Sequence, residues 1–200
     1  MNVELFGNCH YSDERISGEA FERAQLVAAE FHNCSFVDCT FHECVFLDCK
    51  FMDCTFSGCD LSLTQVPKSK FTSAYFEKTK FIGVDWTRAD WSRGNLGKPL
   101  SFSECVLDYC TFLGQSLRGF ACRDSLAREV DFREADLSDA DFSGTDLSGS
   151  IFINTILDGA DFRRASDYNI SPTENSISKA VFSLPEAMSL LYSMDIRLED

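Results

Sequence analysis

The chain has 200 residues, 44% of them apolar and 19 of them phenylalanine, with a formal net charge of −14. This length suffices for one domain with a sizeable core. The excess of acid argues against binding to nucleic acid phosphates or to an anionic membrane, because both need clustered lysine and arginine. No apolar run could span a bilayer. The amino terminus has no basic start followed by an apolar stretch, so we expect a cytoplasmic protein with reduced cysteines.

A large apolar residue, which we call the centre, returns at every fifth position along most of the chain. The centres run from Tyr11 to Leu96 and, after one extra residue within "GKPLS" at 97–101, from Phe102 to Phe162. The residue two positions before the centre is usually small, and in "CSFVDCTFHECVFLDCKFMDCTFSGCDL" it is always cysteine. The other three positions are mostly polar. This regularity predicts a repeat protein.

A period of five fits neither the 3.6-residue period of a helix nor the two-residue period of a flat strand. It does fit a coil in which each five-residue unit forms one side and then turns a corner. The centre and the small residue of every unit then point inward. Stacked coils would bury a continuous column of rings.

The segment "ADLSDADFSGTDLSGSIF" shows the pattern most cleanly: a small residue, an acidic or amide residue, leucine or phenylalanine, then two small or polar residues. This pattern resembles the pentapeptide-repeat family, whose fold is a right-handed quadrilateral β-helix with four pentapeptides in each coil. The resemblance implies an all-β solenoid over residues 9–166 with a register break near 97–101. Residues 1–8 would cap its amino end, and residues 167–200 would cap its carboxyl end with a short α-helix.

On this fold, Cys34, Cys39, Cys44 and Cys49 lie on four successive walls of one coil. Four sulfurs on separate walls cannot converge on one tetrahedral ion. We therefore expect packing thiols, interchangeable with the alanine, serine and threonine of later repeats, and neither a metal nor a cofactor. A disulfide between the stacked Cys34 and Cys54 is compatible with the coil spacing but is disfavoured in a reducing compartment.

Chemistry-bearing motifs are few. His10, His32 and His42 all fall at outward positions, and His32 and His42 lie two repeats apart on opposite walls, where they cannot share a metal. The sequence contains no G-x-G-x-x-G, Walker or G-x-S-x-G motif. We therefore expect no enzymatic activity.

The segment "FSLPEAMSLLYSMDI" predicts a short helix, with Ser183 and Glu186 as a capping box and Pro185 in the first turn. Its apolar face, at spacings of three and four residues, consists of Ala187, Leu190, Leu191 and Met194. This face could cap the last coil, or it could also form a two-fold contact between protomers. The two roles are compatible.

Charge is unevenly distributed. Residues 61–100 carry 3 acids and 7 bases, whereas residues 101–166 carry 12 acids and 6 bases. Lys68, Arg88 and Lys98 follow centres and should point outward. Four aspartates that directly precede centres should ring the acidic segment and contact a partner: Asp131, Asp136, Asp141 and Asp146. A solvated acidic surface that only keeps a rod soluble remains the alternative.

An acidic pentapeptide rod with a carboxy-terminal helix resembles the group that protects DNA gyrase and topoisomerase IV from inhibitors. That group includes Qnr-type quinolone-resistance proteins and the microcin- and albicidin-resistance proteins. The chain length, "WTRADW" and the ending resemble the albicidin-resistance members most. Two loops interrupt the coils of Qnr-type members, whereas this sequence shows a slip of one residue, which favours the loop-free members.

The resemblance implies a rod that mimics duplex DNA and occupies the DNA-binding surface of gyrase. From the apolar face of the carboxy-terminal helix we expect this rod to be a homodimer. Two other functions stay open. One is a scaffolding role with a different protein partner, for which a mixed surface would suffice. The other is regulation of gyrase without any drug.

Overall fold

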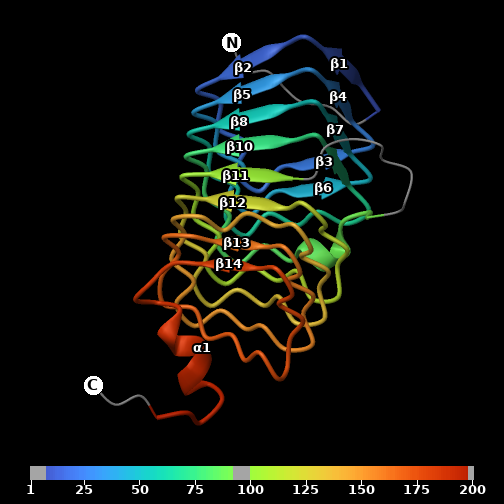
Figure 1. The fold of residues 1–200 in the computed structure, drawn as a ribbon. Coiled ribbons are helices and arrows are strands. Elements are labelled where there is room, and N and C mark those ends of the chain that lie inside the picture. Colours follow the sequence, from blue (N-terminus) through green and yellow to red (C-terminus); the bar gives the residue numbers. More distant parts are fainter. Residues whose placement is uncertain (1–7, 92–99, 198–200) are drawn as a thin grey trace.

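The computed structural model describes residues 8–91 and 100–197, which wind into a rod of about eight stacked coils (Figure 1). The strands are short because each forms one side of a coil. They are β1 (His10–Ser12), β2 (Arg15–Ser17), β3 (Gln25–Val27), β4 (Glu30–His32), β5 (Ser35–Val37), β6 (Val45–Leu47), β7 (Lys50–Met52), β8 (Thr55–Ser57), β9 (Lys70–Thr72), β10 (Tyr75–Glu77), β11 (Ser101–Ser103), β12 (Ala121–Arg123), β13 (Asp161–Phe162) and β14 (Val181–Phe182). A 3₁₀ turn, η1 (Trp86–Arg88), and one helix, α1 (Met188–Tyr192), complete the described elements.

Strands of successive coils pair in parallel, and before the register break the paired residues are 20 apart, as in Phe31 with Phe51. Twenty residues are four pentapeptides, so each coil has four walls. We name the walls A, B, C and D after Phe31, Phe36, Phe41 and Phe46 of the second coil. Wall A carries the sheet β1-β4-β7-β9, and wall B carries β2-β5-β8-β10-β11-β12. The expected four-walled β-helix is confirmed.

The core is a stack of rings. Phe31 and Phe51 of wall A lie parallel with centroids 5.0 Å apart, and Phe36 and Phe56 of wall B are 4.6 Å apart. Rings of adjacent walls meet edge to face, as Phe31 and Phe36 do at 5.3 Å. These distances follow from the strand spacing of about 4.8 Å, and both arrangements are favourable for aromatic rings. The coil spacing thus explains why phenylalanine is so frequent.

The corners depend on the residue two positions after the centre, which has a positive φ. Examples are Asp38 at 53°, Gly58 at 66° and Asp139 at 57°. A left-handed conformation costs roughly 1–2 kcal/mol for most residues but little for glycine. Asparagine and aspartate also tolerate it, because their side chains bond locally. This requirement accounts for the glycine, aspartate and asparagine that recur at this position.

The register break adds more residues to the coil than the five-residue pattern of centres indicates. Across it, paired residues are 26 apart rather than 20, as in Phe76 with Phe102 and Asp85 with Thr111. The chain between Trp91 and Leu100 is therefore six residues longer than a regular coil requires, so the expectation of a single extra residue is corrected. Residues 92–99, which hold Lys98 and most of the predicted break, lie outside the described residues, as do residues 1–7 of the predicted cap.

At the carboxyl end, parallel pairing continues past residue 166. Asp161 of β13 pairs with Val181 of β14, and the rings of Phe162 and Phe182 stack with centroids 5.0 Å apart. Parallel pairing of coils therefore extends into residues 167–200, the segment predicted to form the cap and a possible dimer contact. Within the described ranges, no helix is long and apolar enough to cross a bilayer.

The predicted capping box is wrong. Helix α1 starts at Met188, and its N-cap residue Ala187 makes no side-chain capping bond. The Ser183 hydroxyl instead accepts a hydrogen bond from the backbone N–H of Arg164 at 3.2 Å. Because Ser183 directly follows β14, it stabilises the junction between β14 and the preceding coil rather than the helix.

Candidate functional site

The four aspartates predicted to bind a partner lie on four consecutive walls, but their carboxylates are already in use. All are half-buried. Each accepts a hydrogen bond from the backbone N–H two residues later, at 3.0–3.1 Å: Asp131 from Arg133, Asp136 from Ser138, Asp141 from Ser143 and Asp146 from Ser148. This is the local turn that aspartate favours. The structure therefore gives these residues a role in shaping the coil.

Every arginine in residues 101–166 is paired with a carboxylate. The pairs are Arg118–Asp139, Arg123–Asp141, Arg128–Asp108, Arg133–Asp131, Arg163–Asp161 and Arg164–Asp124. The hydrogen-bonded guanidinium of Arg133 holds the pKa of Asp131 below its ordinary value. These arginines balance six of the twelve acidic side chains in this segment, so the number of aspartates alone does not locate the negative surface.

Two glutamates remain accessible. Glu129 and Glu134 occupy successive corners of one coil with φ of 55° and 61°, and both are exposed. Within the part of the chain that the structure describes, neither carboxylate takes part in an ion pair. Tyr109, 66% exposed, lies one coil away on the same corner column as Glu129. We call Glu129 and Glu134 the acidic edge; the sequence interpretation missed it by weighing only residues that precede a centre.

The basic segment also presents a corner column. Lys68 and Arg88 are exposed on successive coils of wall D, joined by the bond from the Lys68 N–H to the Arg88 carbonyl at 2.8 Å. Other bases of the segment contact acids, including Lys70 with Asp90 at 3.1 Å and Lys78 with Glu104 at 3.7 Å. Lys68 and Arg88 therefore form a basic column, and Glu134 lies two coils further along the rod on the same corner.

Comparison with known proteins supports the repeat assignment. Two family models, described as a pentapeptide repeat region and as pentapeptide repeats, match residues 24–112 and 123–166. The chain belongs to the pentapeptide-repeat family. No curated protein matches it in sequence.

Two solved structures of QnrB1, described as a plasmid-mediated fluoroquinolone resistance protein, have the same fold. A trypsin-treated form has a TM-score of 0.66 and 17% identity, covering 98% of this chain and all of that one. The full-length form has a TM-score of 0.65 and 17% identity, covering 94% of this chain and all of that one. At this identity the likeness establishes the architecture. A nearest relationship to the albicidin-resistance members stays a prediction.

The cysteines of this pentapeptide-repeat protein share one role with its serines and threonines. The Cys54 thiol donates to the carbonyl of Phe31, the centre of the preceding coil, at 3.4 Å. The Thr64 hydroxyl makes the equivalent bond to Phe41 at 2.8 Å. Nine of the ten cysteines are buried, as expected for packing residues. Burial raises the pKa of Cys54 to about 12 and that of Cys105 to about 11.

The predicted apolar face of the carboxy-terminal helix is divided between two environments. Leu190 packs against the core of the last coil, and Ala187 is half-buried. Leu191 and Met194 are exposed, 38% and 43% respectively. In Figure 1, α1 lies beyond the last coil at the end of the rod. The segment therefore caps the pentapeptide solenoid with one side and presents apolar side chains to solvent with the other.

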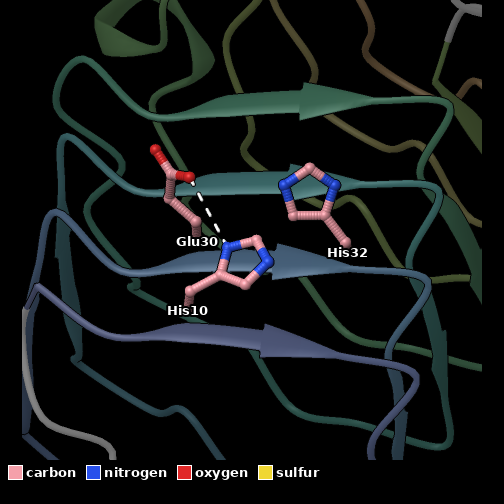
Figure 2. A group of neighbouring side chains, drawn as sticks. All are labelled: His10, Glu30 and His32. Carbon is pink, nitrogen blue, oxygen red and sulfur yellow. Dashed lines mark ion pairs between the residues drawn. The ribbon is translucent and has the colours of Figure 1, made fainter.

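Two of the three histidines lie close together on one wall. His42 lies on wall C beside Glu43, as expected for a residue far from His32. His10 and His32, however, share wall A, since they are one 20-residue coil plus two residues apart, and Glu30 lies beside them (Figure 2). The sequence interpretation compared only His32 with His42.

Proposed function

We propose that this pentapeptide-repeat protein binds DNA gyrase or topoisomerase IV as a mimic of duplex DNA and protects the enzyme from an antibiotic or toxin. The observation that carries the proposal is the acidic edge, whose carboxylates are exposed and free of ion pairs within the described residues. The sequence resemblance to the topoisomerase-protecting group and the fold shared with QnrB1 support it. On this proposal the protein is a cytoplasmic, non-enzymatic binding protein that contacts neither nucleic acid nor membrane.

The physical reason is charge complementarity. An enzyme that holds duplex DNA presents lysines and arginines to phosphates spaced about 1.7 Å apart along the axis. A straight rod with a net charge of −14 offers the same sign of charge on a similar shape. Such complementarity increases the rate of association and fixes orientation more than it adds affinity. We therefore expect binding to depend strongly on ionic strength.

The test measures binding of the purified protein to purified gyrase and topoisomerase IV at increasing salt, followed by supercoiling assays with a quinolone or with albicidin. We expect affinity to fall as salt shortens the screening length, which is about 8 Å at physiological ionic strength. We also expect supercoiling to recover in the presence of the drug. Absence of binding would favour a scaffolding role with another partner. Binding that inhibits gyrase but never relieves the drug would favour the drug-independent regulator.

We also propose that two protomers associate through the exposed side of the carboxy-terminal segment. Leu191 and Met194 are joined there by Leu184, Tyr192 and Ile196, exposed by 81%, 56% and 41%. Changing Leu191 and Met194 together to glutamine should shift the protein from dimer to monomer in light scattering. The melting temperature of the monomer should change little, because neither side chain is in the core.

Leu190→Gln is the matched control. This partly buried residue packs against the core, so its loss should reduce the free energy of unfolding by about 1–2 kcal/mol whatever the oligomeric state. A monomeric unmodified protein at high micromolar concentration would contradict the proposed dimer and leave the segment as a cap alone.

A further inference from the structure

Three potential metal ligands meet on wall A at the amino end of the rod. His10 and Glu30 are direct partners in the parallel pairing of β1 with β4, and His32 lies two residues further along β4. The candidate ligand atoms of the three side chains all lie within 4.8 Å of one another. Figure 2 shows both imidazoles and the carboxylate on the same outer face. We propose that His10, Glu30 and His32 form a binding site for Zn²⁺ or a similar divalent transition metal ion.

The geometry requires little adjustment. The nearest Nδ1–Oε2 distance between His10 and Glu30 is 3.7 Å, and the two imidazole centroids are 4.8 Å apart. Tetrahedral zinc, with bonds of about 2.0–2.2 Å, places its ligand atoms roughly 3.4 Å apart. The side chains of His10 and Glu30 are 57% and 37% exposed, so there is room for the small adjustment required. The paired strands hold their Cα atoms in place.

Neighbouring residues already orient two of the ligands. The Nε2 atom of His10 is 2.9 Å from the Ser12 hydroxyl, which leaves Nδ1 directed toward Glu30. The Oε1 atom of Glu30 accepts a hydrogen bond from Lys50 at 2.5 Å, which leaves Oε2 toward His10. Metal-binding histidines and carboxylates commonly have such partners on their second polar atom, because these fix the tautomer and the orientation. The arrangement is therefore more specific than three polar side chains that happen to be near one another.

The donor set determines the class of ion. Two imidazoles and one carboxylate suit zinc and its transition-metal neighbours, whereas Mg²⁺ prefers oxygen ligands in an octahedron. An ion here would join β1, the outermost strand of its sheet, to β4 of the next coil. Because the ligands are assembled only in the folded state, binding would stabilise the folded rod.

The site is tested by calorimetric titration of the full chain with ZnCl₂. The protein is prepared without a polyhistidine tag. We expect one equivalent to bind and the melting temperature to rise with Zn²⁺, while Mg²⁺ produces neither effect. His10→Gln and His32→Gln should each weaken zinc binding by about tenfold or more, with unchanged circular dichroism. His42→Gln is the matched control: His42 also lies beside a glutamate, at 3.3 Å, but has no second imidazole, so its loss should leave binding unchanged.

Cys9→Ala separates this site from zinc held by a thiol, since Cys9 adjoins His10 in sequence and is half-buried. Zinc binding that persists in this variant supports the proposed ligands. Loss of binding in Cys9→Ala, its persistence in both histidine variants, or the absence of any saturable zinc binding would overturn the proposal.

Discussion

The free energy of unfolding should fall steeply once the pH exceeds about 9, because buried thiols of the folded protein resist ionisation. Burial raises the pKa of Cys54 and of Cys110 to about 12, and that of Cys105 to about 11, from an ordinary value of 9.0. Between the ordinary and the raised values, the unfolded chain loses these protons and the folded chain keeps them. Stability is thus fully present below pH 9 and is lost as the pH rises toward 11–12. Each thiol contributes about 1.4 kcal/mol per pH unit to this loss.

The measurement is urea unfolding followed by circular dichroism under reducing conditions at several pH values from 8 to 11. The matched variant changes Cys54, Cys105 and Cys110 to serine, the residue found at the same repeat position at Ser69 and Ser125. Its hydroxyl can donate to the same carbonyl, as Ser69 does to Phe46 at 2.7 Å, but does not ionise in this range. In this variant we expect the free energy of unfolding to fall less steeply with pH, by about 4 kcal/mol per pH unit. Equal slopes would show that other groups, such as the lysines, control alkaline unfolding.

The sequence predicts the architecture well because a single local unit is repeated. A centre and a small residue in every pentapeptide can both be buried only if the chain turns at each unit. The ring stacks and the carbonyl-bonded thiols of Cys49 and Cys54 follow directly from that geometry. The glycines that recur two positions after the centre, such as Gly58 and Gly144, also indicate the left-handed backbone of the corners.

The surface is harder to predict, because its contacts join different coils. The ion pair of Arg128 with Asp108 spans 20 residues, and that of Arg164 with Asp124 spans 40. Such pairs require the 20-residue period of the coils, and a pair that spans the register break, such as Lys78 with Glu104, requires the 26-residue offset found there. The half-buried state of Asp136 depends in addition on its bond to Ser138, which the outward position of an aspartate does not reveal. A comparison of residues 20 positions apart in the sequence, the length of one coil, would have paired His10 with Glu30.

Neutralising the acidic edge should weaken gyrase binding more than removing equal charge elsewhere on the rod. In Glu129→Gln with Glu134→Gln, side-chain size is kept and two exposed charges are lost. We expect affinity for gyrase to fall by about tenfold at physiological salt, since loss of charge at an interface changes both the association and the dissociation rate. Drug protection should fall with it. The melting temperature should stay the same, because neither carboxylate forms an ion pair within the described residues.

The matched control is Asp136→Asn with Asp146→Asn. It also removes two charges, but from half-buried carboxylates that accept hydrogen bonds from Ser138 and Ser148. The asparagine oxygen can still accept the backbone N–H, so the turns should survive and affinity should change little. An equal loss in both double variants would mean that gyrase responds to the overall charge of the rod rather than to the acidic edge. A third variant, Lys68→Gln with Arg88→Gln, removes the basic column. If only this variant abolished binding, the rod would dock through its basic column, and the DNA-mimic proposal would be wrong.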